Sequence, residues 1–276
     1  MNGPVSLRLE MLQVARLAPN VLGDSADRVA GFLRSQFDED GGVRDRAGKS
    51  DLYYTVFGLE GLIALRQEVP VAKVRPFLET FGDGEGLDFV HLTCLARSWA
   101  ALGRDASPRE RALRIAARVA PGGNGSIYHE FLKIGALEDL GGRPDPGAAA
   151  AVLKLQSDDG SFGGTTPTTA AGVTLAHHLG ADVPGRAVDW ILARARPAGG
   201  FLAVPEAPVP DLLSTATALH ALAAAKAPMG PLRDPMLDFV DTLWTGKAFC
   251  GSWADDVPDC EYTYYALLAL GHLSLA

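Results

Sequence analysis

The sequence predicts an all-α protein made of six consecutive helical hairpins. Loop glycines recur at positions 41, 84, 122, 160, 199 and 251, and an apolar segment flanks each of them on both sides. Within these segments the apolar residues fall three and four apart, which is the period of an amphipathic helix. No segment shows the alternation of a strand, and a repeat of this spacing is typical of stacked helical units.

The first hairpin, residues 24–67, shows how each unit is built. Val29, Phe32 and Leu33 give its first helix one apolar face, whereas the second helix, within "YTVFGLEGLIAL", is apolar nearly all round. We therefore expect the second helix to lie inside. A glycine ends the first helix because it adopts a positive φ, and Ser50–Asp51 offers a side-chain oxygen to cap the second.

The remaining units follow the same order along the chain. They are expected at 70–103, 107–141, 145–180, 184–226 and 231–276, with Asp211 and Asp259 as caps in the last two. An extra N-terminal helix is expected at about 5–19. Because no linker separates the units, residues 1–276 are predicted to form one domain. Hairpins that stack in this way form an open solenoid or a closed ring, and the periodicity fits both.

Composition excludes several classes of protein. Of the 276 residues 47% are hydrophobic, which is enough for a large core, and the net charge of −8 disfavours nucleic acid and anionic membranes as partners. No apolar run is long enough for a transmembrane segment, and the N-terminal region lacks a signal-peptide core. Three cysteines do not make a disulfide framework. These features predict a cytoplasmic location.

Several motifs resemble the repeats of one superfamily. "AVLKLQSDDGSFGG" and "FLRSQFDEDGG" are similar to the Gln-x-x-Asp-Gly repeat of squalene-type terpene cyclases and of protein prenyltransferase β subunits. "GGVRDRAGKSDLYYTVFGLEGLIAL" and "GSWADDVPDCEYTYY" resemble two late repeats of the prenyltransferase β subunits. The resemblance implies a closed α6/α6 toroid with inner and outer helix rings. Unit six then touches unit one, which makes Asp259 and Tyr54 neighbours.

The resemblance to prenyltransferases implies a zinc site that activates a substrate thiol. Zinc is held there by an aspartate, a cysteine two residues later and a histidine of the adjacent repeat. Here Asp259 matches the aspartate, Cys260 follows it at once, Glu261 takes the place of the cysteine and Tyr54 that of the histidine. Because adjacent helical residues point about 100° apart, the shift of the cysteine matters. We keep Asp259, Cys260 and Glu261 as candidate zinc ligands.

The same resemblance implies a diphosphate site at this rim. Arg44, Arg46 and Lys49 are the candidate cations for it. Asp255 and Asp256, in the loop ahead of Asp259, repel a diphosphate unless Mg²⁺ bridges them. The alternative is that the cations form surface ion pairs with these carboxylates. Prenyltransferases of this kind also need a helical-repeat α subunit, which is a candidate partner.

A cyclase interpretation uses the same residues in other roles. Class II triterpene cyclases protonate an alkene or epoxide with an aspartic acid at the head of an inner helix, and Asp259 or Glu261 is the candidate acid here. Burial and neighbouring carboxylates favour the protonated form that an acid needs. Against this, familiar cyclases of the type carry two helical barrels. Aromatic faces line such a cavity, and the expected substrate contacts are Tyr53, Phe57, Tyr262, Tyr265 and Trp253; Tyr54, Phe89, Trp99, Tyr128 and Tyr264 are further aromatic candidates.

A second candidate metal site lies at the start of the inner helices of units two and three. Asp88 and His91 share a helix face at i, i+3, and His129 begins the next inner helix. The alternative is that these polar side chains cap their helices.

Three functions therefore follow from the sequence. The first is prenyl transfer from a prenyl diphosphate in a central apolar cavity. The second is proton-initiated cyclisation of an isoprenoid with Asp259 or Glu261 as the acid. The third is a non-catalytic toroid that binds a lipid or a helical partner.

Overall fold

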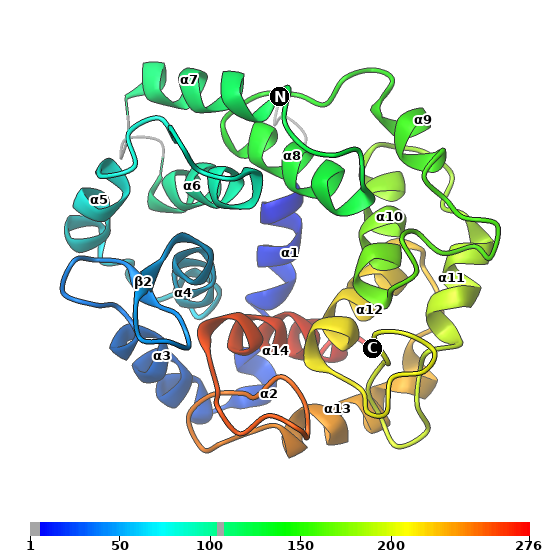
Figure 1. Cartoon of the computed structure of the whole chain (residues 1–276). Helices are drawn as coiled ribbons and strands as arrows, with labels where there is room; N and C mark the ends of the chain where they lie inside the picture. The colour runs from blue at the N-terminus through cyan, green and yellow to red at the C-terminus, as the bar shows by residue number, and fades with distance from the viewer. Residues whose placement is uncertain (1–5, 104–107) are drawn as a thin grey trace.

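The chain forms two concentric rings of helices (Figure 1). The structure is a computed structural model that describes residues 6–103 and 108–276. Inner and outer helices alternate along the chain, and their order shows six hairpins. The outer helices are α3 (Ser25–Ser35), α5 (Val71–Glu79), α7 (Arg109–Val119), α9 (Ala148–Leu153), α11 (Gly185–Leu192) and α13 (Arg233–Thr242). The inner helices are α4 (Leu52–Ala64), α6 (Phe89–Leu102), α8 (Ile127–Asp139), α10 (Thr166–His178), α12 (Leu212–Ala224) and α14 (Cys260–Leu273). A short 3₁₀ turn, η2 (Gly230–Leu232), precedes α13.

The ring is closed. Each inner helix packs against the next, and α14 packs against α4. This contact decides between the open and closed arrangements that the periodicity allowed, and it confirms the α/α toroid. Each predicted unit contains one outer and one inner helix. The predicted start of the third unit, residue 107, lies outside the described residues.

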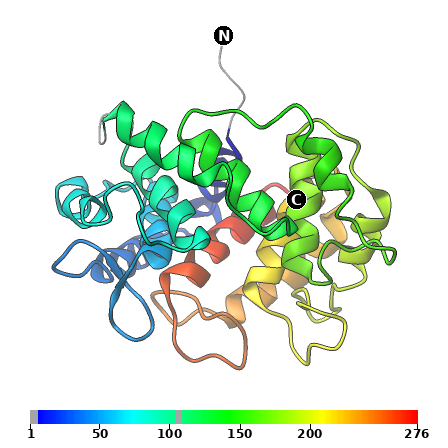
Figure 2. The same cartoon turned by 45° about the horizontal axis from the view of Figure 1, so that its top comes forward.

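Every inner helix starts with the same local structure. An extended residue precedes the helix, and its side-chain oxygen accepts a hydrogen bond from the backbone N–H three residues later; the six N-caps are Asp51, Asp88, Ser126, Thr165, Asp211 and Asp259. This bond satisfies one of the free amides of the first turn. The caps predicted at Asp51, Asp211 and Asp259 are confirmed. The long loops ahead of α4, α12 and α14 project from one face of the ring (Figure 2).

The N-terminal segment forms two helices where the sequence analysis expected one at about 5–19. α1 (Leu7–Ala15) ends before Pro19, and Pro19 starts the short α2 (Pro19–Leu22). Proline has no N–H for a helical hydrogen bond, but it suits the first position of a new helix. Residue 5 lies outside the described residues.

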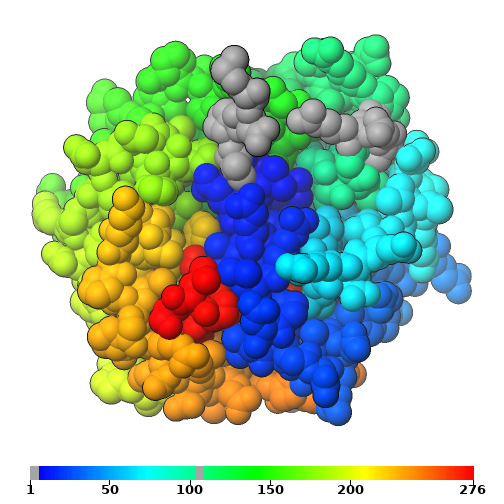
Figure 3. All heavy atoms as spheres, turned by 180° about the vertical axis from the view of Figure 1, so that it is seen from behind, coloured from blue at the N-terminus to red at the C-terminus, as the bar shows by residue number. Residues whose placement is uncertain are grey.

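α1 lies across one end of the inner ring. It packs against α14, α4 and α8, and seen from behind it covers the centre of the ring (Figure 3). The contact is close, since a Cβ on Gly271 would lie 2.1 Å from the backbone oxygen of Val14. His178 of α10 adds an ionic link, because its ring nitrogens lie 3.0 Å from Glu10 of α1 and 2.7 Å from Glu138 of α8.

One small sheet breaks the all-helical pattern that the sequence predicts. β1 (Val43–Arg44) pairs antiparallel with β2 (Ser50–Asp51), and Arg46 lies in the loop between them. Strands of two residues are too short to give an alternating sequence pattern, which is why the pattern did not reveal them. The hairpin places Arg46 beside the start of α14, where it contacts Asp255 and Asp259. In the described part of the chain, no helix is both long and apolar enough to span a bilayer.

Candidate active site

A cavity of about 280 Å³ lies in the centre of the inner ring. Apart from Thr168 and Met11, its lining residues stand two, five, six or nine positions after the N-cap of their helix. This spacing defines one face of a helix. The outermost level, here called the mouth positions, is two residues after each cap, and five of its six members line the cavity: Tyr53, Val90, Tyr128, Pro167 and Leu213. Tyr128 is 39% exposed, which places this end of the cavity at the rim.

The walls of the cavity are aromatic on one side and small on the other. Phe57 of α4 lies 5.5 Å from Tyr265 of α14 and 5.0 Å from Tyr53 between ring centroids. On the opposite side α10 presents Ala170 and Ala171. Aromatic faces stabilise cations in a dry pocket, while small side chains leave room for a ligand.

The inner end of the cavity is polar. The floor positions, nine residues after each cap, include Arg97, Thr174 and His220, and Met11 of α1 closes this end. Seven residues separate mouth and floor positions along each helix, or about 10 Å at 1.5 Å per residue. Arg97 donates hydrogen bonds of 2.8 and 3.0 Å to the two oxygens of the fully buried Glu60.

Two histidines meet beside the floor. His220 Nδ1 lies 3.0 Å from His272 Nε2. Burial lowers the pKa of His220 to about 4 and that of His272 to about 3, so both are neutral at physiological pH. The sequence analysis assigned no role to either histidine.

Glu261 occupies the sixth mouth position. It lies two residues after the cap Asp259, and its Oε1 accepts a hydrogen bond of 2.6 Å from the Tyr53 hydroxyl. Burial raises the pKa of Glu261 to about 7; the charge of Asp259 adds to this rise and the Tyr53 hydroxyl opposes it. Glu261 is not itself part of the lining, but its partner Tyr53 is. A carboxyl group that is about half protonated near pH 7 thus lies one hydrogen bond from an aromatic cavity.

Asp259 has a different environment although it is the more deeply buried of the two. Its Oδ1 accepts from the Tyr262 amide at 2.9 Å, and its Oδ2 accepts from Arg46 Nε at 2.7 Å. Burial raises the pKa of Asp259, while these two hydrogen bonds oppose that rise. The ion pair with Arg46 holds Asp259 in place at the rim, and we therefore regard Asp259 as a structural residue rather than as the acid.

Arg46 joins the first and last units of the ring. Besides Asp259 it binds Asp255 with hydrogen bonds of 3.1 and 2.7 Å, and it lies 5.4 Å from the ring centre of Tyr262. The hydrogen bonds that Arg46 donates to Asp255 and Asp259 raise the pKa of Arg46, although burial opposes them. Tyr54 lies close enough that Asp259 and Arg46 both affect its pKa, which burial raises to about 12. The expected proximity of Asp259 and Tyr54 is therefore found.

The residues proposed for zinc do not form a ligand set. Cys260 is 1% exposed, and burial raises the pKa of its thiol, which opposes the thiolate that zinc needs. Asp259 is held by Arg46, and Glu261 by Tyr53. Within residues 6–103 and 108–276, no three side chains of the types His, Cys, Asp and Glu are grouped to hold a metal ion. These residues do not fit zinc as they are arranged.

The second candidate metal site is also arranged otherwise than expected. Asp88 Oδ2 lies 2.8 Å from His91 Nδ1, so this pair does share a face, but His91 Nε2 lies 3.3 Å from Asp51. His129 Nδ1 instead accepts a hydrogen bond of 3.0 Å from the backbone N–H of Asn124. Asp51 and Asp88 are also helix caps, which agrees with the alternative of local capping.

Three other predicted contacts lie apart from the cavity. Arg44 donates a hydrogen bond of 2.5 Å to the backbone oxygen of Ser35, and Lys49 lies in the exposed part of the β1–β2 loop. Trp253 is 48% exposed, and its indole N–H donates a hydrogen bond to Thr242 on the outer helix α13. Trp253 therefore does not line the cavity.

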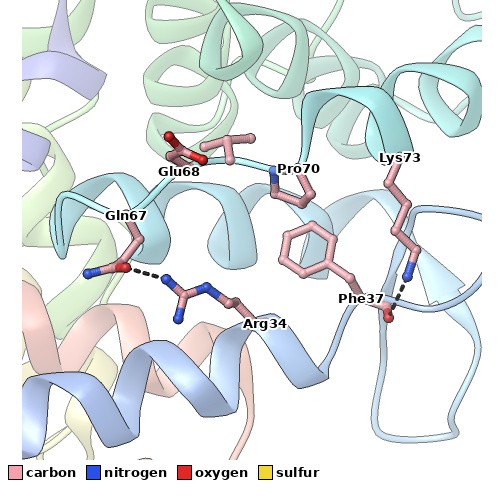
Figure 4. A pocket seen from close by; sticks show the side chains of 7 residues that line it. Arg34, Phe37, Gln67, Glu68, Pro70 and Lys73 are labelled. Carbon is pink, nitrogen blue, oxygen red and sulfur yellow. Dashed lines mark hydrogen bonds between the residues drawn. The ribbon is translucent and has the colours of Figure 1, made fainter.

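A larger hollow, of about 550 Å³, lies on the outside of the toroid (Figure 4). Its walls come from α3, α5 and the segment before α5, and the polar groups of Arg34 and Lys73 bind Gln67 and the backbone of Phe37. The polar side chains that line this hollow therefore hold the outer helices together. We place the functional site in the smaller central cavity, where polar groups converge on an apolar space.

Fold and cavity together define a class: a single closed α/α toroid with an apolar central cavity. A family profile described as the prenyltransferase alpha-alpha toroid domain matches residues 15–90 and 149–275, well over half of the chain. The chain belongs to this family. The unmatched part contains α7, α8 and most of α6, and none of the motifs quoted above for the resemblance lies in it.

Comparison with solved structures shows a similar architecture. The chain resembles a type II terpene cyclase from Scytonema, a Tyr-to-Phe variant without ligand. The TM-score is 0.58 at 14% sequence identity, over 93% of this chain and 97% of that one. At this identity the likeness shows the fold alone. No curated protein sequence matches the chain.

Proposed function

We propose that the protein cyclises an isoprenoid by proton transfer from Glu261, in the manner of a type II terpene cyclase. The observation that carries this proposal is a half-buried carboxyl, with its pKa raised to about 7, that is hydrogen-bonded to Tyr53 at the mouth of an aromatic cavity. A general acid works best when its pKa lies near the operating pH. Membership of the prenyltransferase toroid family supports an isoprenoid as the substrate.

In this reaction the substrate alkene lies at the mouth of the cavity beside Tyr53, and the proton of Glu261 reaches one alkene carbon through the Tyr53 hydroxyl, which gives up its own proton and takes that of Glu261. The π bond breaks, a C–H bond forms, and the neighbouring carbon becomes a cation. A second alkene of the same molecule then attacks this cation and closes a ring. The aromatic rings of Phe57, Tyr264 and Tyr265 lie in the cavity where the charge develops. Loss of a proton restores an alkene, so the product is an isomer of the substrate, and Glu261 regains a proton from solvent at the rim.

The geometry gives less support to prenyl transfer, the first prediction from the sequence. Arg46 already binds two carboxylates, and Cys260 is buried away from any ligand set. Prenyl transfer, a magnesium-bridged diphosphate and an α-subunit partner stay predictions. The single barrel does not count against a cyclase, because this one toroid spans 97% of the Scytonema cyclase chain.

The test is incubation with prenyl alcohols and prenyl diphosphates in D₂O, followed by mass spectrometry. In D₂O a cyclase converts the substrate to an isomer in which one deuterium replaces one hydrogen, and it releases no diphosphate. We expect Glu261→Gln to lower the rate by about 10²- to 10⁴-fold, the range for loss of a general acid. Asp256→Asn, in the exposed rim loop, is the matched control and should keep the wild-type rate. Diphosphate release, or full activity in Glu261→Gln, would contradict the proposal.

A further inference from the structure

The last step of the proposed cyclisation needs a base inside the cavity. The cation that remains after ring closure becomes an alkene only when a neighbouring carbon loses a proton, and a group in contact with the substrate has to take it. Most of the described side chains that line the cavity are apolar, and nearly all the others carry a hydroxyl, a thiol or a guanidinium group. His220 is the exception, because a neutral imidazole has a nitrogen lone pair that accepts a proton.

His220 leaves one ring nitrogen free. Its Nδ1 lies 3.0 Å from Nε2 of His272, and within the described residues its own Nε2 has no hydrogen-bond partner. Nε2 is nevertheless not one of the fully buried atoms that lack a partner there, so part of its surface is accessible. His220 is only 9% exposed and it borders the cavity. The free nitrogen therefore faces the cavity.

His272 holds the His220 ring from the neighbouring helix α14. It is 3% exposed and does not line the cavity. One proton lies in the contact between the two neutral rings. If His220 Nδ1 carries this proton, the lone pair of Nε2 faces the cavity; if His272 carries it, an N–H without an acceptor faces the cavity. Buried backbone N–H groups without a partner are rarer than carbonyl groups without one, and the same preference favours the first arrangement here.

The pair is neutral at physiological pH, because burial lowers the pKa of His220 to about 4 and that of His272 to about 3. A neutral ring is ready to take a proton. Low basicity is sufficient, since a carbocation is a far stronger acid than an imidazolium ion. It also lets the ring return the proton to water after the product has left, which prepares the site for the next turnover.

His220 lies at the end of the cavity where the reaction should finish. It occupies a floor position, whereas Tyr53, which passes on the proton of Glu261, occupies a mouth position. The two levels are about 10 Å apart along the helices. A base at this distance does not meet the first cation at the mouth. The positive charge reaches it only after the alkenes in between have reacted.

We propose that His220 is the base that ends the cyclisation, with His272 as the positioning residue that holds its ring. The inference rests on the proposed function, since it completes the reaction of the same site. Nε2 takes a proton from the carbon next to the cationic carbon, and the electron pair of that C–H bond becomes the new π bond. The imidazolium shares its Nδ1–H with His272 and later gives a proton to solvent. One proton enters through Glu261 and one leaves through His220, so the product remains an isomer of the substrate.

Product analysis of the intact protein tests this assignment. The probes are the geranyl, farnesyl and geranylgeranyl alcohols and diphosphates, and mass spectrometry measures the mixture of products in D₂O. His220→Gln removes the base and keeps the acid, so the substrate should still take up deuterium and cyclise. Loss of a positioned base slows a proton transfer by about 10²- to 10⁴-fold. The wild-type alkene should therefore become a minor product, beside other alkene isomers and an alcohol formed when water captures the cation.

Further variants separate a base from a structural residue. His220→Ala leaves space for a small molecule, and added imidazole should restore the wild-type alkene. His272→Phe removes the contact with Nδ1 and should lower the share of this alkene. The conservative variant His272→Gln, whose amide oxygen accepts a hydrogen bond from Nδ1, should restore it. His177→Gln, at the exposed end of α10, is the matched control and should give wild-type products.

Nitrogen NMR tests the pair without any turnover. In ¹⁵N-labelled wild type at neutral pH, Nε2 of His220 should be unprotonated, and the spectrum of His220→Gln identifies its signal. An Nε2 that carries the proton would overturn the inference, whether or not the protein is a cyclase.

Three outcomes of the product analysis would also overturn it. Unchanged products from His220→Gln in an active enzyme would refute the base and leave Glu261 as the acid. A folded His220→Gln that no longer incorporates deuterium would show that His220 acts before ring closure. If wild type cyclises none of the probes, the proposed function fails and the base fails with it.

Discussion

Substitution of Glu261 by Gln should change how the stability of the protein depends on pH. Glutamine has nearly the same shape, keeps an oxygen that can accept from Tyr53, and cannot ionise. The folded protein raises the pKa of Glu261 from its ordinary value of 4.5 to about 7. Between these two values the folded state holds a proton that the unfolded state has lost, so folding becomes less favourable as pH rises.

The magnitude follows from the two pKa values. At 1.36 kcal/mol per pKa unit, ionising Glu261 in the folded state costs about 3 kcal/mol. This loss begins near pH 4.5, is nearly complete just above pH 7, and stays constant at higher pH. The stability of wild type minus that of Glu261→Gln should therefore fall by about 3 kcal/mol from pH 4.5 to 8.

Urea unfolding of both proteins at a series of pH values measures this difference. Other titrating groups, such as Asp139, affect both proteins equally and cancel in the subtraction. Glu39→Gln changes an exposed carboxyl and is the matched control, with a curve parallel to wild type. Parallel curves for Glu261→Gln and wild type would refute the reasoning, because Glu261 would then ionise as it does in the unfolded chain.

Two more predictions concern the contact of α1 with the ring. Gly271→Ala should destabilise the fold by about 1–3 kcal/mol in urea unfolding, since the added Cβ meets the backbone oxygen of Val14. Gly135→Ala is the control and should not destabilise it, because the nearest atom to a Cβ there is 3.9 Å away. Equal losses of stability in the two variants would contradict the packing argument. His178→Gln removes an imidazolium that is held by two carboxylates. Burial lowers the pKa of His178, but its hydrogen bonds with these carboxylates outweigh burial and raise that pKa from 6.5 to about 9. That stabilisation, about 3 kcal/mol, is complete below pH 6.5 and is lost as pH rises through 9. The free energies of unfolding of wild type and variant, measured in urea, should therefore converge at alkaline pH. A difference that stays constant with pH would contradict the linkage.

Local signals in the sequence predict most of the fold. The caps at Asp51, Asp211 and Asp259 depend only on residues within one turn, and the apolar periods depend only on the adjacent helix. Closure of the ring was predicted from family resemblance alone. Local signals do not give it, because closure depends on the angle between successive hairpins. The break at Pro19 was readable from the sequence, since proline cannot continue a helical hydrogen-bond pattern.

The site was less predictable than the fold. Glu261 was identified as a candidate, but its separation from Cys260 depends on a rotation of about 100° between adjacent residues, which turns the thiol into the core. Arg97 and Glu60 were missed although each is a lone charge in an apolar inner helix. Counting nine residues from each cap places both on the same level, and this register is the signal that would have found them.

Closure of the ring also has a consequence for the life of the chain in the cell. The ion pair of Arg46 and Asp259 joins positions separated by 213 residues, and α1 packs directly on α14. During synthesis the apolar faces of the early inner helices therefore stay exposed until the helices that cover them have been synthesised. Nascent chains with such distant contacts fold slowly and are prone to aggregate. We expect productive expression of this toroid to depend on chaperones that shield those faces until α14 has left the ribosome.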